Sequence, residues 1–228
     1  MIRPVTATFP PQPPFPPPWR PPGQPGPAPG PPARPGPPPV SPAVQPTRIW
    51  LDPAASGVYE RLLQRRIVVA SGTLDGEAAT RLCAQLLTLD AESGEPVRLE
   101  IQGLEAELPA VLTVMGVLDV LRAPVHARAG GRISGPALGI LASATHRHAY
   151  PNALFALAEP RMNLDGTVTA LASQEEQIRV MLDQLYARLA EVTGREVDEI
   201  RADARRQRLL TVDEAIGYGL IEGRATPS

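Results

Sequence analysis

A chain of 228 residues is long enough for one folded domain with an extension, and 43% hydrophobic residues suffice to build a core. The net charge of −2 at pH 7 provides no attraction for DNA, RNA or an anionic membrane, so we expect no nucleic-acid partner. No apolar run approaches the ~20 residues of a membrane span, and the start of the chain lacks the apolar segment of a signal peptide. Cytoplasmic location, without membrane association, is therefore expected.

Proline content divides the chain into two parts. Most of the 29 prolines lie in residues 1–47, where they remove backbone donors and favour solvated polyproline II. This segment is predicted to be a disordered proline-rich tail, and residues 48–228 are predicted to hold the folded domain. An alternative interpretation gives the tail a partner, because Pro10 and Pro13 have the spacing of groove-binding motifs and Trp19 could anchor them.

Beyond the tail, short β-branched runs alternate with stretches that repeat apolar residues at helical spacing. Strands are predicted over residues 66–70, 97–101, 125–129, 147–150 and 153–158. Helices are predicted over residues 75–90, 108–122 and 168–193, with another opened by Ser134, Gly135 and Pro136. Gly194 is expected to end the long helix as a C-cap. Repeated strand–helix units of this kind predict an α/β domain built on parallel strands.

The single cysteine and the histidines are the candidates for redox or metal chemistry. Cys83 cannot form an intramolecular disulfide, and its apolar neighbours predict a small buried side chain. His146 and His148 flank Arg147 in a basic stretch, but no cysteine or third histidine accompanies them. We therefore expect a solvated loop there rather than a metal site. No cofactor and no metal ion are predicted for this chain.

Two long segments resemble the proteolytic subunit of the Clp protease family, a family of serine peptidases. The first runs from Leu62 to Glu92 and contains an Ala-Gln-Leu-Leu helix before an acidic turn. The second runs from Thr193 to Ile221 and is similar to the closing helices and strand of that family. Pro151-Asn152 and Glu159-Pro160 fall between them at matching positions. The chain is accordingly identified as a degenerate member of this family.

The resemblance implies a crotonase-like spiral of ββα units with a long protruding handle helix. Subunits of this family form seven-membered rings that stack in pairs, so homo- or hetero-oligomers with Clp proteolytic subunits are expected. Arg206 matches the family arginine that makes contacts across rings, whereas Arg161, Met162 and Asn163 replace the glycines that begin the handle. An unfoldase ATPase is a further partner that the resemblance allows. The chain has no Gly-x4-Gly-Lys-[Ser/Thr] loop, so a partner would have to use the ATP.

The resemblance also assigns the catalytic positions one by one. Residues 129–137 are similar to the nucleophile segment, and Ser134 falls on the catalytic serine. Judged by residue type alone, Ser134 could equally be a helix N-cap, because serine is preferred there. Ala158 occupies the histidine position before Glu159-Pro160, and alanine cannot accept a proton. Gln207 occupies the aspartate position and, being neutral, cannot stabilise an imidazolium.

The glycine pair that supplies an oxyanion donor in the family is replaced by a stretch containing Glu105. Gly103 could supply a donor if the loop shifted by two residues, whereas Glu105 and Glu107 would oppose a developing oxyanion. Asp203 lies four residues before Gln207, which displaces it by about 6 Å along a helix axis. We therefore expect that Asp203 does not replace the missing aspartate.

Three functions remain open at this stage. The first is a catalytically inactive, structural or regulatory subunit of a Clp-type proteolytic ring. The second is a residual serine endopeptidase of the ATP-dependent Clp system, with Ser134 as nucleophile and His126 or a neighbouring subunit's histidine as base. The third is a crotonase-like binder of acyl thioesters, which rests on the relation between the folds alone.

Overall fold

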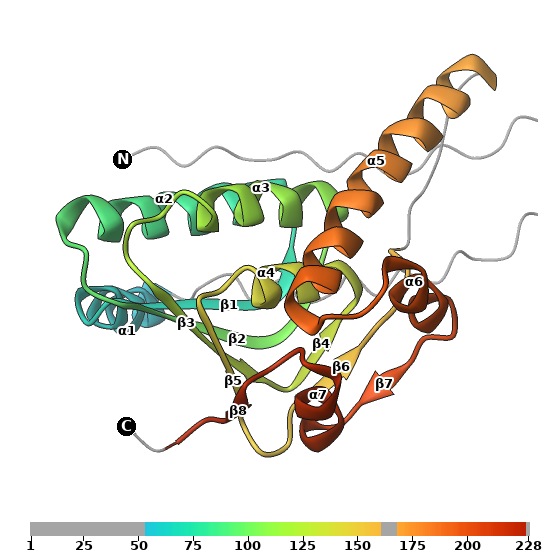
Figure 1. The fold of residues 1–228 in the computed structure, drawn as a ribbon. Coiled ribbons are helices and arrows are strands. Elements are labelled where there is room, and N and C mark those ends of the chain that lie inside the picture. The colour runs from blue at the N-terminus through green and yellow to red at the C-terminus, as the bar shows by residue number, and fades with distance from the viewer. Residues whose placement is uncertain (1–52, 161–167, 227–228) are drawn as a thin grey trace, which may run out of the picture. The chain divides into compact units, whose positions relative to one another are not determined.

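The computed structural model describes residues 53–160 and 168–226 (Figure 1). The proline-rich tail, the proposed anchor Trp19 and the replaced handle glycines at 161–163 lie outside the described residues. Within the described ranges, strands and helices alternate along the chain, as the residue pattern predicts for an α/β domain. None of the helices in these ranges is long and apolar enough to cross a bilayer.

The larger sheet has five strands, and every neighbouring pair in it is parallel. Its order is β1-β2-β3-β5-β8, so each connection must cross over one face of the sheet. The prediction of a parallel sheet built from repeated strand–helix units is therefore confirmed. The strands are β1 (Ile67–Leu74), β2 (Val97–Ala106), β3 (Val125–Gly130), β5 (His146–Ala149) and β8 (Gly223–Arg224).

A smaller sheet continues from the larger one and has the order β4-β6-β7. Its strands are β4 (Arg132–Ser134), β6 (Leu154–Ala156) and β7 (Leu209–Leu210). The chain passes from β3 to β4 through Gly131, whose φ of +64° lies in the left-handed region that favours glycine. β4 and β6 are parallel, whereas β6 and β7 are antiparallel.

Seven α-helices and one short 3-10 helix are described. Figure 1 shows α2 and α3 together on one side of the larger sheet, and the amino-terminal half of α5 extends beyond the other elements. The helices are α1 (Pro53–Gln64), α2 (Gly76–Glu92), α3 (Leu108–Leu118), η1 (Gly135–Ala137), α4 (Leu138–Ala142), α5 (Val168–Thr193), α6 (Val197–Arg205) and α7 (Val212–Tyr218).

The long helix α5 has the predicted bounds. Gly194 follows it with a φ of +66°, and the Gly194 N–H donates to the carbonyl of Ala190 at 2.8 Å. This is the expected C-cap, because glycine enters the left-handed region without a steric penalty. Some elements differ from the predictions. Helix α1 was not predicted, α3 ends at Leu118 rather than at 122, and β6 is shorter than the strand predicted over 153–158. The strand predicted over 147–150 is present as β5, which also includes His146, so the two histidines do not lie in the expected solvated loop.

One part of the core lies between α2 and α3 and the larger sheet, and the same cluster extends to β4, β6 and the helices α4 to α7. Along β2, Val97, Leu99 and Ile101 are fully buried, while the residues between them are half-buried. This alternation follows from the two-residue period of a strand, which sends successive side chains to opposite faces. Cys83 on α2 is buried, as predicted, and burial raises the pKa of its thiol.

Asp75 opens α2 as its N-cap. The backbone N–H of Ala78 donates to Oδ1 of Asp75 at 2.9 Å, which satisfies one of the free donors of the first turn. Asp75→Ala is expected to lower the free energy of unfolding by about 1 kcal/mol, measured by urea denaturation. Asp75→Asn keeps an acceptor at the same place and should retain most of the stability. Equal losses in both variants would contradict the capping role.

Candidate functional site

Ser134 is the last residue of β4 and immediately precedes η1. Its backbone is extended, with φ −130° and ψ 141°, and its side chain makes no capping hydrogen bond to the turn that follows. Ser134 therefore stands at the N-cap position of η1, but its hydroxyl does not act as a cap in this structure. Pro136 lies in the first turn of η1, as predicted, where its missing N–H leaves no bond unmade. Ser134 is half-buried, so its hydroxyl remains available for another partner.

Ala158, at the histidine position, lies beside the backbone that follows Ser134. In the register of β4 and β6, Ser134 is paired with Ala156, two residues before Ala158. Gly135 has a φ of +56°, and a Cβ built on it would stand 3.2 Å from the carbonyl oxygen of Ala158. Only glycine fits this approach without strain. The structure thus brings the nucleophile position and the empty base position together.

Gln207, at the aspartate position, lies close to the same place. It directly precedes Arg208, whose carbonyl accepts a hydrogen bond from the N–H of Leu157 at 2.9 Å. Gln207 has a φ of +52° and ends α6 in a Schellman arrangement. In that arrangement the N–H of Gln207 donates to Ala204, and the N–H of Arg208 donates to Asp203. The three catalytic positions therefore meet at one end of the smaller sheet.

The stretch expected to replace the oxyanion loop is a strand instead. β2 continues through Ala106 and pairs with β1 beyond an irregularity at Ser71 and Gly72. Gly103 has a φ of +55°, and a Cβ built on Gly131 would stand 3.1 Å from the amide nitrogen of Gly103. Gly103 therefore lies against the chain that leads to Ser134. The sequence did not predict this close approach of the two glycines. It offered Gly103 only as a possible oxyanion donor in a shifted loop.

The histidines lie on the larger sheet, away from Ser134. His126 is near the beginning of β3, and its ring packs edge-on against His146, with 4.8 Å between ring centroids. A strand rises about 3.3 Å per residue, so Gly130 at the end of β3 is already about 13 Å from His126. His126 of the same chain is therefore out of hydrogen-bond reach of the Ser134 hydroxyl. Within the described ranges, no three His, Cys, Asp or Glu side chains lie close enough to hold a metal ion.

Asp203 is buried and makes hydrogen bonds inside the domain. It is 6% exposed and accepts hydrogen bonds from the Tyr218 hydroxyl and from Nη1 of Arg208, both at 3.0 Å. The Arg195 guanidinium lies 4.0 Å from the centre of the Tyr218 ring. Burial, with the Asp203 carboxylate beside it, raises the pKa of the Tyr218 hydroxyl, which therefore stays protonated. Asp203 ties α6 to α7 and to the start of β7.

Asp203→Ala should consequently lower the free energy of unfolding by about 2 kcal/mol, because the buried Tyr218 hydroxyl loses its acceptor. Tyr218→Phe removes the same bond from the other side, and we expect the double variant to be less destabilised than the sum of the singles. Urea denaturation of all three variants measures this coupling. Strict additivity would show that the two side chains do not depend on each other.

Among the three positions that the resemblance assigns, only Ser134 keeps the residue type expected in a serine peptidase. A serine attacks only when a base within hydrogen-bond reach takes its proton and an acidic group orients that base. The methyl group of Ala158 and the amide of Gln207 do neither. Nearby, Glu159 forms an ion pair with Arg205 at 3.5 Å, on exposed surface. Arg206 is exposed at the C-cap of α6, and its role in contacts between subunits stays a prediction.

Comparison with known proteins gives one consistent result. The family model described as Clp protease matches residues 52–226, which include every described helix and strand. The chain is 31% identical over 168 residues to the ATP-dependent Clp protease proteolytic subunit 1 of Mycobacterium tuberculosis, covering 72% of this chain and 84% of that protein.

It is 32% identical over 168 residues to the ATP-dependent Clp protease proteolytic subunit 4 of Rhodococcus jostii, covering 72% of this chain and 87% of that protein. It is also 32% identical over 170 residues to the ATP-dependent Clp protease proteolytic subunit 1 of Corynebacterium jeikeium, covering 72% of this chain and 89% of that protein. The crotonase-like α/β fold expected from the resemblance is confirmed by the family match. The chain belongs to the Clp protease family.

Proposed function

We propose that this chain is a catalytically inactive subunit of a cytoplasmic Clp-type proteolytic ring, in which it has a structural or regulatory role. The observation that carries the proposal is the meeting of Ser134, Ala158 and Gln207 at one end of the smaller sheet. The backbone of a peptidase site is present there, while the base and its orienting acid are absent. A protein that keeps the scaffold without the chemistry can still serve as a subunit.

The losses of reaction rate that such replacements cause support the proposed inactivity. Loss of the base alone forfeits on the order of 10⁴-fold or more in rate, because triad residues act as a unit. Loss of an oxyanion donor typically costs about 10²–10³-fold when the triad is intact. These losses are not additive, and either one is enough to leave a very poor peptidase.

Assembly is supported by the shape of α5 and by the relatives. α5 has 26 residues, which corresponds to about 39 Å of helix. Its amino-terminal half extends beyond the other elements in Figure 1, and the α5 residues that pack against the core run from Met181 to Val192. Most helical stability comes from tertiary packing, so a projecting helix favours a partner. The curated relatives are themselves described as proteolytic subunits.

Native mass spectrometry tests the proposal directly. The full chain is mixed with a Clp proteolytic subunit whose peptidase activity has been measured beforehand, and the assemblies are weighed. We expect mixed rings, with peptidase activity that falls as this chain replaces active subunits. A chain that stays monomeric in the mixture and leaves the activity unchanged would overturn the proposal. An unfoldase ATPase as a further partner is a separate proposal, tested by adding it to the mixed ring.

Arg206 offers a second test of assembly. We expect Arg206→Glu to shift the chain from assembled to unassembled species in the same mass spectra, because it places a negative charge where the family has an arginine contact. Arg81→Glu is the matched control, since Arg81 is exposed on α2 and pairs only with its helical neighbour Glu77. Equal effects of the two substitutions would show that Arg206 has no specific role between subunits.

A residual serine endopeptidase is the alternative. The half-buried Ser134 hydroxyl without a capping bond favours it, because a serine retained only as a cap would make that bond. Since His126 of the same chain is out of reach, a neighbouring subunit would have to lend the base. Labelling of Ser134 decides between the two functions.

A further inference from the structure

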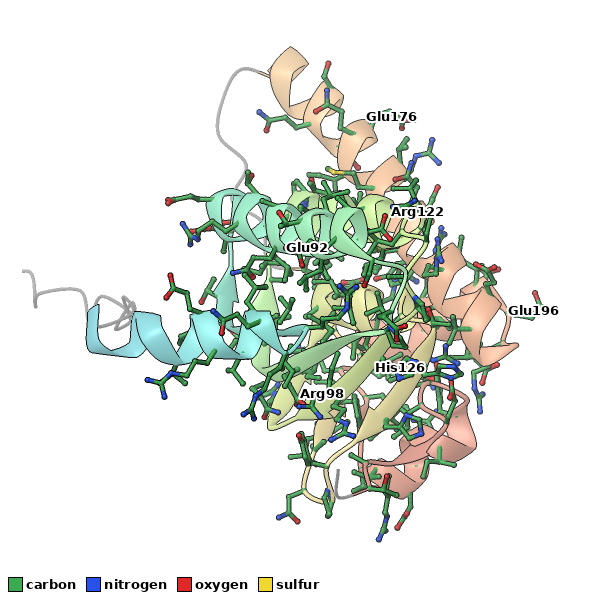
Figure 2. All side chains as sticks on the ribbon, turned by 90° about the vertical axis from the view of Figure 1, so that its left-hand side faces the viewer. Glu92, Arg98, Arg122, His126, Glu176 and Glu196 are labelled. Atoms are coloured by element: carbon green, nitrogen blue, oxygen red, sulfur yellow. The ribbon has the colours of Figure 1, made fainter. Side chains whose placement is uncertain are left out.

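All three histidines of the chain lie on one face of the larger sheet. His126 is on β3, and His146 and His148 are on β5. His126 pairs directly with His146, and His148 follows two residues later, so the three side chains leave the sheet on the same side. Figure 2 shows His126 beside Arg98, its partner on β2. The sequence offered His146 and His148 without a third histidine, and the sheet supplies it.

Two of the rings already have the spacing that a shared metal ion requires. The rings of His126 and His146 pack edge-on, with 4.8 Å between their centroids. Two imidazoles on one tetrahedral Zn²⁺ ion, each with a Zn–N distance of about 2.0–2.1 Å, have centroids roughly 5 Å apart. In the side-chain positions of the structure, the described residues do not bring a third ligand to the same point. A three-histidine site therefore needs rotation of the rings.

The surroundings of His146 and His148 leave room for that rotation. The side chain of His146 is 50% exposed. His148 pairs with Gly223 on β8, and a Cβ built on Gly223 would come no closer than 4.0 Å to Cδ2 of His148. Because glycine has no side chain, the His148 ring lies over bare backbone and can adopt another staggered rotamer. Two residues along a strand span about 7 Å, which the rings of a His-x-His pair bridge by leaning toward one ion.

Glu222 orients one of the rings. Nδ1 of His146 lies 3.2 Å from Oε2 of Glu222, so the Nδ1–H donates to the carboxylate and Nε2 keeps its lone pair. Glu222 is itself held in place, because its N–H donates to the carbonyl of Arg147 at 2.8 Å and its carboxylate lies 3.5 Å from Nη2 of Arg147. A carboxylate in this position fixes the tautomer and the direction of histidines that bind metal ions.

We propose that His126, His146 and His148 bind one Zn²⁺ ion. Imidazole nitrogens are preferred ligands of Zn²⁺, and three of them with one water complete a tetrahedral site. Glu222 is a positioning residue that acts through His146. The ion would fasten β3 to β5 and, through Glu222, to the start of β8. This inference does not depend on whether Ser134 is active.

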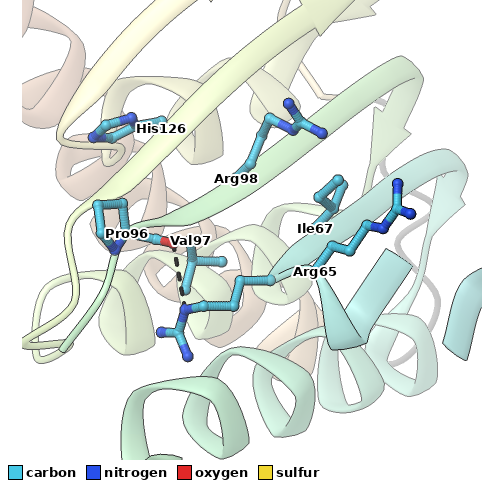
Figure 3. Close-up of a pocket in the computed structure, with 7 residues that line it drawn as sticks. Arg65, Ile67, Pro96, Val97, Arg98 and His126 are labelled. Atoms are coloured by element: carbon cyan, nitrogen blue, oxygen red, sulfur yellow. Dashed lines mark hydrogen bonds between the residues drawn. The ribbon is translucent and has the colours of Figure 1, made fainter. Parts of the chain in front are cut away.

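Neighbouring positive charge limits the affinity of this site. Figure 3 shows Arg65 and Arg98 around the pocket that His126 borders. Nε of Arg98 lies 3.4 Å from Oε1 of Glu100, and Arg128 makes a hydrogen bond with the Tyr150 hydroxyl. These contacts occupy the two guanidinium groups without removing their charge. We therefore expect an ion that a chelator removes easily, rather than one on which folding depends.

The test titrates Zn²⁺ into the full chain, produced without a histidine tag, by isothermal titration calorimetry. We expect one ion per chain, undisturbed by Mg²⁺, which prefers oxygen ligands. His126→Gln, His146→Gln and His148→Gln should each weaken binding at least tenfold, and Glu222→Gln about tenfold. Co²⁺ in place of Zn²⁺ should give the visible absorption bands of a tetrahedral site in the wild type but not in His146→Gln.

Glu77→Gln is the matched control for Glu222→Gln. Glu77 is 72% exposed on α2 and pairs with Arg81, so its loss removes one carboxylate and should leave Zn²⁺ binding unchanged. Zn²⁺ should also raise the melting temperature of the wild type, because it binds the folded chain in preference to the unfolded one. His146→Gln replaces an exposed side chain and carries the test if another histidine variant unfolds.

Several results would overturn the proposal. These are absence of Zn²⁺ binding, binding that survives all three histidine substitutions, and an equal loss in Glu222→Gln and Glu77→Gln. Zn²⁺ binding that Cys83→Ser removes would place the ion at the buried thiol instead. Displacement of Zn²⁺ by Mg²⁺ would identify a site made of carboxylates.

Discussion

A fluorophosphonate probe is expected to label the purified chain no faster than it labels the Ser134→Ala variant. The probe reacts with serines whose proton is taken by a nearby base, and Ala158 offers none. Gln207 supplies no charge to orient a base introduced from elsewhere. Gel fluorescence after labelling, followed by mass analysis of the modified peptide, measures the reaction. A serine hydrolase of known activity serves as the positive control.

Introducing histidine at 158 and aspartate at 207 tests the same prediction from the opposite direction. Because Ser134 and Ala158 already lie side by side, Ala158→His with Gln207→Asp should raise the labelling rate at Ser134 by at least 10²-fold, the usual lower range for a positioned base. Peptide hydrolysis should stay low, since Glu105 stands where the family has an oxyanion donor. Ser134→Ala in the same background should abolish the labelling. Rapid labelling of the unmodified chain at Ser134 would instead establish the residual endopeptidase.

Phe155→Ala is expected to lower the free energy of unfolding by about 3–5 kcal/mol. Phe155 is the largest of the fully buried side chains and lies in the central strand of the smaller sheet, paired with Ile133 on β4 and Leu210 on β7. Removing the ring leaves a cavity between strands that cannot collapse, because both neighbours are fixed by backbone pairing. The site formed by Ser134 and Ala158 should loosen with it.

Urea denaturation, followed by circular dichroism, measures the loss. Val180→Ala is the control, since Val180 is 45% exposed on α5 and its truncation should change stability by less than about 0.5 kcal/mol. The loss of free energy of unfolding for Phe155→Leu should lie between those of the two other variants, because leucine fills part of the space. A loss for Phe155→Ala no larger than that for Val180→Ala would show that the smaller sheet does not belong to the cooperative core.

Local pattern accounts for most of the elements. α2 was predictable because Asp75 caps it and apolar residues follow at helical spacing, and α5 because Gly194 ends a continuous apolar stripe. α1 was missed because it lies close to the proline-rich tail and ends at Gln64 without a glycine after it. The left-handed turn that follows is made by Arg66, with a φ of +57°, which no residue-type rule predicts. α3 was predicted too long, because nothing local to Leu118 signals its end.

Long-range pairing explains the remaining differences. Residues 102–106 look like a loop in isolation, since Gly103 and two glutamates interrupt the apolar run. They form a strand because β1 offers Gly72, Thr73 and Leu74 as pairing partners across a register shift. β5 begins at His146, one residue before the predicted strand, because His146 pairs with His126 on β3. Such pairings depend on residues far along the chain and leave no local pattern.

The sequence by itself determined which residues stand at the positions that the family resemblance assigns to catalysis. An alanine at 158 and a glutamine at 207 cannot carry out proton transfer in any fold, because the required groups are not there. Family membership also followed from residue order alone. The tertiary structure decided where those positions lie, namely against Ser134 at one end of the smaller sheet. It also decided that the Ser134 hydroxyl makes no capping bond, although Ser134 stands at the N-cap position of η1.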